Sequence, residues 1–191
     1  TEEGIRNFWR WFGSSRVVDD QGRPLVVYHG TTADFGSPEF KPYNRKGEQL
    51  GFGIHFAVDA KFADKYASDP NIARKGPSPQ IIPVYLNIRN PLIADAVVVE
   101  GTPEFALAEK MAGSKLFTVK DEQGRRTVYL QNAIDVTSPQ RAEKLIREAG
   151  YDGVRYTSVI RGRGINAGAT SKGQSWLVFR PEQIKSATGN R

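Results

Sequence analysis

Residues 51–66 read GFGIHFAVDAKFADKY, a short apolar run with one histidine that passes directly into a helical pattern. The run GIHFA predicts a strand, Asp59 is a typical helix N-cap, and Phe62 and Tyr66 lie one helical turn apart. The chain's other histidine lies in VVYHGTT, residues 26–32. Because histidine changes charge near neutral pH and glycine lets the backbone approach a ligand, both runs indicate a site. Taken alone, each histidine equally fits a half-buried structural role.

The composition suits one compact, basic domain without cysteine. The 191 residues are 39% hydrophobic, which is enough for one core. The absence of cysteine excludes disulfides and thiolate metal sites, and two histidines supply a zinc site poorly, so we expect no metal. The net charge of +6 favours an anionic partner: nucleic acid, a phosphorylated small molecule or an acidic surface. No stretch is long enough to span a membrane, so we expect no membrane partner.

The other patterns mix short helices and strands without regular alternation, which predicts an α+β domain. Residues 1–13 place Ile5, Phe8, Trp9 and Phe12 at helical spacing, and we expect this helix to dock on the core. The further expected elements are strands at 24–30, 53–57, 81–88, 151–156 and 176–181, helices at 103–112 and 138–150, a hairpin at 116–130 turning near Gln123 and Gly124, and loops at 31–50, 71–79 and 158–175.

Two positions refine these elements. Pro83 lies inside the strand pattern at 81–88 and predicts an edge position or a bulge, because proline cannot donate to a ladder. Ser138 can cap the helix at 138–150, with Pro139 at its first position and Gly150 after its last turn.

Three segments in the same order resemble a known family. YHGT (residues 28–31), the strand and helix at 51–66, and WLVFRPEQI (residues 176–184) are similar to the nicotinamide-binding core of ADP-ribosyltransferases of the poly(ADP-ribose) polymerase type. In that family the helix tyrosine lies eleven residues beyond the strand aromatic, as Tyr66 lies beyond His55. The whole chain most resembles the ADP-ribosyltransferase domains of phage and bacterial polyvalent and toxin proteins.

The resemblance implies a fold and a substrate. The expected fold is an α+β, split, mixed β-sheet core with flanking helices. It forms a single domain over residues 1–191, with an N-terminal helix and turn at 1–24 and the motif-bearing core at 25–185. NAD is the implied substrate. Because the chain begins at Thr1 and carries no signal-peptide pattern, we expect a domain excised from a longer protein.

The resemblance also implies residue roles. His29 binds an adenosine ribose hydroxyl, the backbone of Gly30 bonds the nicotinamide amide, and Tyr66 stacks on the nicotinamide ring. The expected catalytic residues are His29, His55, Ser175 and Gln174, and the expected NAD-binding residues are His29, Gly30, Thr31, Gly53, His55, Phe56 and Tyr66.

The chain departs from the family pattern at two positions. His55 replaces the usual strand tyrosine and adds a titratable group, so NAD affinity is expected to depend on pH. Ser175 replaces the glutamate that the polymerising members keep, while Gln174 should point to the opposite face. A neutral serine cannot stabilise a forming cation as a carboxylate does, which argues against polymer synthesis. Glu182 is a poor substitute because it lies beyond the strand, whereas Glu48 in the loop at 31–50 is a candidate.

A basic, glycine-rich stretch precedes the final strand, where related transferases carry a substrate-reading loop. Its Arg161, Arg163 and Lys172 can meet an acidic protein or a phosphate backbone. Incidental charge on a flexible surface loop explains them equally well.

The sequence therefore favours a mono-ADP-ribosyltransferase that releases nicotinamide and modifies a protein or nucleic acid in a cytoplasm, as a toxin or effector with a neutralising or activating partner. NAD hydrolysis and RNA-directed NAD-dependent transfer keep the same fold. A metal-independent ribonuclease with His29 and His55 as base and acid, and a non-catalytic NAD-fold binding module, are alternatives of other classes.

Overall fold

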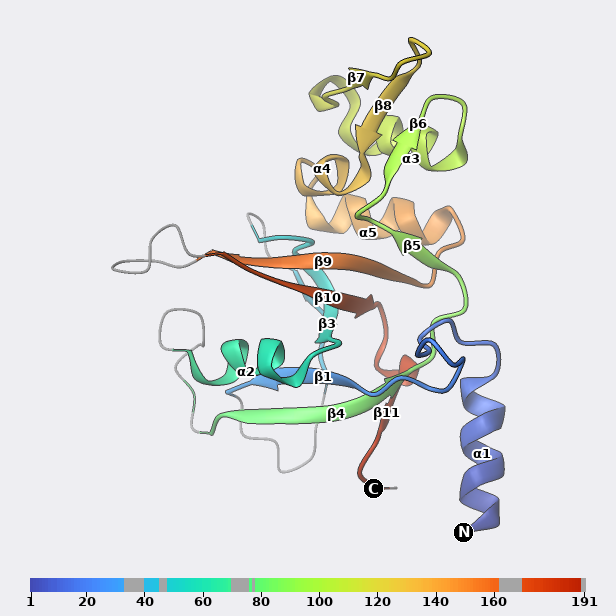
Figure 1. Cartoon of the computed structure of the whole chain (residues 1–191), viewed down its shortest axis with the longest axis vertical. Coiled ribbons are helices and arrows are strands. Elements are labelled where there is room, and N and C mark those ends of the chain that lie inside the picture. Colours follow the sequence, from blue (N-terminus) through green and yellow to red (C-terminus); the bar gives the residue numbers. More distant parts are fainter. Residues whose placement is uncertain (33–39, 45–47, 70–75, 77, 162–169, 190–191) are drawn as a thin grey trace.

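The computed structural model describes residues 1–32, 40–44, 48–69, 76, 78–161 and 170–189. Within them a mixed sheet has the strand order β11-β4-β1-β3-β10-β9-β5, with β2 paired to β3 beside this path (Figure 1). All pairs are antiparallel except β5 with β9. A smaller sheet has the order β6-β8-β7. The α+β prediction with a mixed sheet and flanking helices is confirmed.

The strands are β1 (Val27–Thr31), β2 (Tyr43–Asn44), β3 (Phe52–Ala57), β4 (Gln80–Leu86), β5 (Pro91–Ile93), β6 (Val97–Val99), β7 (Val119–Lys120), β8 (Arg126–Tyr129), β9 (Gly153–Arg161), β10 (Thr170–Val178) and β11 (Ile184–Ser186). The helices are α1 (Glu2–Phe12), α2 (Ala60–Ser68), α3 (Pro103–Ala112), α4 (Leu130–Asp135) and α5 (Pro139–Glu148). The predicted helices at the start, after Asp59, at 103–112 and at 138–150 are therefore confirmed, whereas helix α4 and the strands β2, β5, β6 and β11 were not predicted.

The large sheet is split between β1 and β3. Only one residue pair, Tyr28 with Ala57, joins these two strands, whereas β1 pairs with β4 along its whole length. In Figure 1 the strands β9 and β10 lie above β1 and β4, and β3 lies between these two halves of the sheet. Residues of both halves, such as Val27 and Trp176, share one apolar cluster between them.

The second apolar cluster covers the opposite side of β9 and β10. It joins Leu177 and Val154 of these strands to α3, α4 and α5 through residues such as Phe105 and Ile146. The small sheet packs onto the same cluster through Val98 and Val128. Through these contacts the helices α3, α4 and α5 and the small sheet pack against the β3, β10 and β9 half of the large sheet.

Gln183 ties the end of the chain to this platform, which explains the glutamine of WLVFRPEQI. Its buried side-chain oxygen accepts the N–H groups of Phe179 and Arg180 at 3.1 Å. Its amide nitrogen donates to the carbonyls of Asn87 and Asp152 at 3.1 and 2.6 Å. The amide therefore has a structural role away from the histidines.

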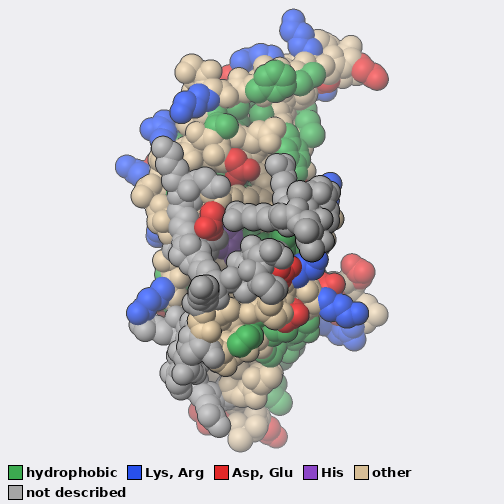
Figure 2. Space-filling view, turned by 90° about the vertical axis from the view of Figure 1, so that its left-hand side faces the viewer, with side chains coloured by type: hydrophobic (Ala, Val, Ile, Leu, Met, Phe, Trp, Pro, Cys, Tyr) green, Lys and Arg blue, Asp and Glu red, His purple; other side chains and the backbone are tan. Residues whose placement is uncertain are grey.

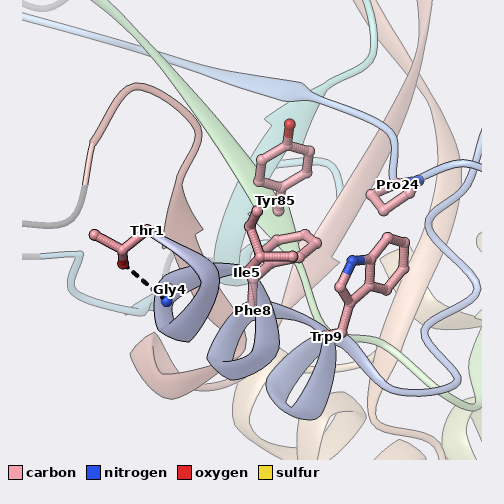
Figure 3. Close-up of a pocket in the computed structure, with 7 residues that line it drawn as sticks. All are labelled: Thr1, Gly4, Ile5, Phe8, Trp9, Pro24 and Tyr85. Atoms are coloured by element: carbon pink, nitrogen blue, oxygen red, sulfur yellow. Dashed lines mark hydrogen bonds between the residues drawn. The ribbon is translucent and has the colours of Figure 1, made fainter.

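Helix α1 only partly docks on the core. Thr1 caps it by accepting from the Gly4 N–H at 3.1 Å, and Phe12 is buried. Ile5 and Trp9, however, are 60% and 52% exposed. Together with Tyr85 and Pro24 they line an open pocket of about 440 Å³ (Figure 3). The helix therefore docks on the core through Phe12 and through Phe8, whose ring centroid lies 5.0 Å from that of Tyr85 in β4, whereas Ile5 and Trp9 do not take part in the expected docking.

Three local predictions also need correction. Pro83 is not on an edge strand, since β4 lies between β1 and β11. Its carbonyl accepts a hydrogen bond from the Ala187 N–H, so its nitrogen, which cannot donate, faces Ala187 just after the end of β11. Ser138 occupies the N-cap position of α5 without a side-chain hydrogen bond. Within the predicted loop at 158–175, the described residues 158–161 and 170–175 are strand, because β9 and β10 pair from Arg161 and Thr170 inward.

Candidate functional site

His29 lies where β1 begins to separate from β3. Its Nδ1–H donates to the carbonyl oxygen of His55 at 2.8 Å. Its ring packs against Phe40 and Phe56, with ring centroids 5.4 and 5.5 Å away. Burial lowers the pKa of His29, and its bond to His55 opposes this only in part. The imidazole is therefore neutral near pH 7 and keeps a lone pair on Nε2, to which no hydrogen bond is formed within the described part of the chain.

The backbone of Gly30 faces the split. The Pro83 carbonyl points toward β11, so Tyr28 and Gly30, opposite Pro83 and Ile81, direct their N–H and C=O groups away from β4. After the pair of Tyr28 with Ala57, the His55 carbonyl of β3 accepts a hydrogen bond from the His29 ring and not from a backbone N–H of β1. The imidazole thus holds the strands apart and leaves the Gly30 backbone available to a ligand.

The missing side chain of Gly30 also has a structural reason. A Cβ at this position would lie 1.8 Å from the carbonyl oxygen of Ala63 in α2. The glycine therefore lets the helix that carries Tyr66 sit directly against β1. The sequence predicted that the absence of a side chain lets a ligand approach Gly30. In the structure, the backbone of α2 at Ala63 occupies the space that a side chain would need.

His55 is fixed in the interior of the site. Its Nε2–H donates to the Phe52 carbonyl at 2.8 Å, and its Nδ1 accepts from the Tyr156 hydroxyl at 2.6 Å. Burial lowers the pKa of His55 to about 4, although the bond to the Phe52 carbonyl opposes the shift. Both nitrogens are thus engaged and the ring is neutral. This argues against the ribonuclease alternative, which needs a titrating acid and base at neutral pH.

The neutral state of His55 moves the expected pH dependence to acid. We expect NAD affinity to be constant between about pH 6 and 8, because the pKa of His55 lies well below this range. The expected pH dependence of NAD affinity through His55 therefore falls below this range.

Stability should instead fall in acid. The pKa of His55 is about 4 in the fold and 6.5 ordinarily, so between these values the unfolded chain binds more protons and stability decreases as the pH is lowered. We expect His55 to lower the free energy of unfolding by about 2 kcal/mol between pH 6.5 and 4, a value that already allows for its partial exposure. Urea unfolding of the wild type and of His55→Gln across this range measures it. Parallel curves for the two proteins would show that His55 does not contribute.

Tyr66 and Ser175 face the same side of the sheet as His55. The Tyr66 hydroxyl lies 2.9 Å from Ser158 Oγ, and its ring contacts Phe62. Burial raises the pKa of Tyr66. Ser175 is buried and pairs with Tyr156 and Ala57 across the sheet, so it lies in the floor between the two aromatic residues. Gln174 is exposed on the opposite face, as strand alternation predicts.

Two of the predicted NAD-binding residues, Phe56 and Gly53, have structural roles, and a third, Thr31, lies at the end of β1. Phe56 is 1% exposed and belongs to the cluster between the half-sheets, so it acts by packing against His29. Gly53 has φ of +74°, and a Cβ there would meet the Leu177 side chain at 2.7 Å. Thr31 ends β1 opposite Gln80. The structure does not bring the first two into the open part of the site.

Two of the predicted substrate-loop residues lie on the paired strands β9 and β10. Arg161 ends β9, and Lys172 is exposed on β10 opposite Val159. Arg163 lies outside the described residues. The predicted substrate-loop residues Arg161 and Lys172 therefore belong to paired strands, which the sequence missed because its glycines suggested an irregular loop.

The site also contains residues that the sequence analysis did not select. Tyr156 and Ser158, two apart on β9, hold His55 and Tyr66 respectively. Alternation in the sequence RYTSV was a signal for their common face. Gln49 bonds the outer edge of β9: its side chain donates to the Thr157 carbonyl and accepts from the Val159 N–H, at 2.8 and 2.9 Å. That contact has no local sequence signal.

Histidine surface reaches solvent in the middle of the face shown in Figure 2, with Asp and Glu side chains near it. A pocket of about 690 Å³ beside α5, and the one beside α1, lie away from the histidines. The described residues contain no group of three or more His, Asp or Glu that could hold a metal ion. Within the same residues no helix has the length and apolarity needed to cross a membrane.

Comparison with known proteins gives one match. The model of a family described as ADP-ribosyltransferase in polyvalent proteins matches residues 19–191, which is nearly all of the chain except α1. No curated protein and no solved structure matches the chain.

Proposed function

The chain belongs to the ADP-ribosyltransferases of polyvalent proteins, and from this premise we propose that it binds NAD in the split between β1 and β3, releases nicotinamide and transfers a single ADP-ribose to a macromolecule. The observation that carries the proposal is the contact between the His29 ring and the His55 carbonyl. Because of this contact, the Gly30 backbone does not pair with β3, and both the Gly30 backbone and the His29 Nε2 are available to a ligand.

The chain's residues fit the parts of NAD. The Gly30 N–H and C=O match the carbonyl and amino groups of the nicotinamide amide, and Tyr66 offers a ring to stack on the nicotinamide. The lone pair of His29 Nε2 can accept a ribose hydroxyl. Because nicotinamide is cationic in NAD, it leaves without a proton donor, so a site with neutral histidines is suitable.

The reaction breaks the bond between the ribose C1′ and the nicotinamide nitrogen, and the bonding electron pair stays on nicotinamide. The acceptor's nucleophilic atom then forms a bond to C1′ and gives up its proton. Ser175 in the floor of the site carries no charge, which favours one transfer over polymer synthesis. The acceptor is a protein or a nucleic acid, and the net charge of +6 favours an acidic one.

A toxin or effector role, with a neutralising or activating partner and action in a cytoplasm, belongs to the same proposal. Its support is the family alone, whose members lie in polyvalent proteins.

Incubation with NAD and a cell lysate tests the proposal. We expect nicotinamide release, and labelled ADP-ribose in the protein or nucleic-acid fraction. We also expect NAD at a hundred times its Kd to stabilise the fold by about 2.7 kcal/mol, visible as a thermal shift. Nicotinamide release without labelled acceptor would indicate a hydrolase, and a thermal shift without release would indicate a binding module. If neither nicotinamide release nor a thermal shift is observed, the proposal is overturned.

A further inference from the structure

We propose that Glu48 supplies the carboxylate that Ser175 does not, and that it stabilises the positive charge that develops on the ribose when nicotinamide leaves. The inference rests on the proposed function.

Gln49 fixes the position of this segment at the site. Its side chain bonds the Thr157 carbonyl and the Val159 N–H, the two edge groups on either side of Ser158. Ser158 in turn contacts the Tyr66 hydroxyl at 2.9 Å. The residue after Glu48 is therefore bonded to the edge of β9 beside Ser158, the residue that contacts Tyr66, the proposed nicotinamide-stacking residue.

Leu50, two residues after Glu48, is a second anchor. Its side chain is buried, and its N–H donates to an Asp135 carboxylate oxygen at 3.1 Å. It has φ of 42°, and it is the one non-glycine residue with positive φ within the described ranges. A strained backbone persists only where its surroundings hold it, and such positions cluster at functional sites. Both anchors directly follow Glu48 in the chain, so they hold the backbone after Glu48 beside β9.

The charge of Glu48 acts on the site. It helps to raise the pKa of Tyr66, after burial, which is the larger cause. Glu48 is itself exposed, so its carboxylate can reach a ligand. Its position on the segment before β3 differs from the usual glutamate position on the strand that Ser175 occupies.

The chemistry requires an acidic group here. As the C1′–nitrogen bond breaks, positive charge grows on the ribose, and a carboxylate aimed at that charge stabilises the transition state more than the ground state. When the acceptor's nucleophilic atom bonds to C1′, its proton passes to a Glu48 oxygen and then to water. The neutral histidines, whose pKa values are lowered, are poor proton acceptors in comparison.

Glu48→Gln tests the inference, with Glu182→Gln as the matched control. Glu182 is also exposed, but it lies in the turn after β10, where its backbone carbonyl accepts from Trp11. We expect Glu48→Gln to lower kcat for nicotinamide release about a hundredfold while the Kd for NAD changes less than about threefold. Glu48→Asp should restore part of the rate. Glu182→Gln should equal the wild type.

A second readout does not depend on turnover. Titration of the Tyr66 ring by NMR, assigned with Tyr66→Phe, should show a lower pKa in Glu48→Gln than in the wild type and no change in Glu182→Gln. An active wild type with equal kcat in both glutamine variants overturns the role of Glu48 alone. A wild type that neither binds nor cleaves NAD overturns the proposed function, and the role of Glu48 with it.

Discussion

Gly30→Ala should destabilise the fold by about 3 kcal/mol or more and remove the stabilisation by NAD. The new Cβ would lie 1.8 Å from the carbonyl oxygen and 2.7 Å from the carbonyl carbon of Ala63, so the backbone of α2 has to move. Movement of α2 carries Tyr66 away from its hydroxyl partner, Ser158. Urea unfolding gives the stability, and thermal shift with NAD gives the binding.

Gly189→Ala is the matched control. Nothing lies within 4 Å of a Cβ at that position, so its free energy of unfolding should stay within about 0.5 kcal/mol of the wild type. If Gly30→Ala were equally neutral, the close packing of α2 on β1 would be wrong, and with it the place of Tyr66 in the site.

His29→Ala should lower nicotinamide release at least about a hundredfold. The substitution removes the group that accepts a ribose hydroxyl and positions NAD, and a small misplacement of the substrate costs about 10² in rate. It also frees the His55 carbonyl, which can then accept from the Gly30 N–H, so that β1 and β3 pair further and narrow the split. Single-turnover release of nicotinamide at saturating NAD measures the combined loss.

A stability control separates this effect from general damage. Val27→Ala removes a fully buried side chain from the same strand and should destabilise the fold by roughly 1–3 kcal/mol, yet retain nicotinamide release below its melting temperature. His29→Gln, which keeps a donor and an acceptor, should fall between His29→Ala and the wild type. If Val27→Ala loses as much activity as His29→Ala, the loss in His29→Ala is explained by lower stability and not by removal of a ligand contact.

The sequence predicted the elements that its own local pattern specifies. The helix after Asp59 follows from a capping residue and apolar spacing, and the side chain of Asp59 does accept the Lys61 N–H at 2.8 Å. Ser175 and Gln174 point to opposite faces because strand alternation is a backbone property. These predictions needed no knowledge of the neighbouring strands.

The remaining features depend on contacts between distant segments. Nothing near His55 in the sequence indicates that Tyr156, about a hundred residues later, occupies its second nitrogen and that burial lowers its pKa. The glycines after Arg161 suggested a loop, but pairing with β10 extends β9 to that residue. The contact of the His29 ring with the His55 carbonyl likewise exists only once β1 and β3 meet.

Gln49 has one further consequence, for association between molecules. β5 pairs with β9 only up to Arg155, so the Thr157 carbonyl and Val159 N–H would otherwise form an unpaired sheet edge, ready to accept a strand from another molecule. The side-chain amide of Gln49 satisfies both groups with a single residue and thus stops the sheet from growing sideways. The same side chain that fixes Glu48 also protects the protein from edge-to-edge aggregation.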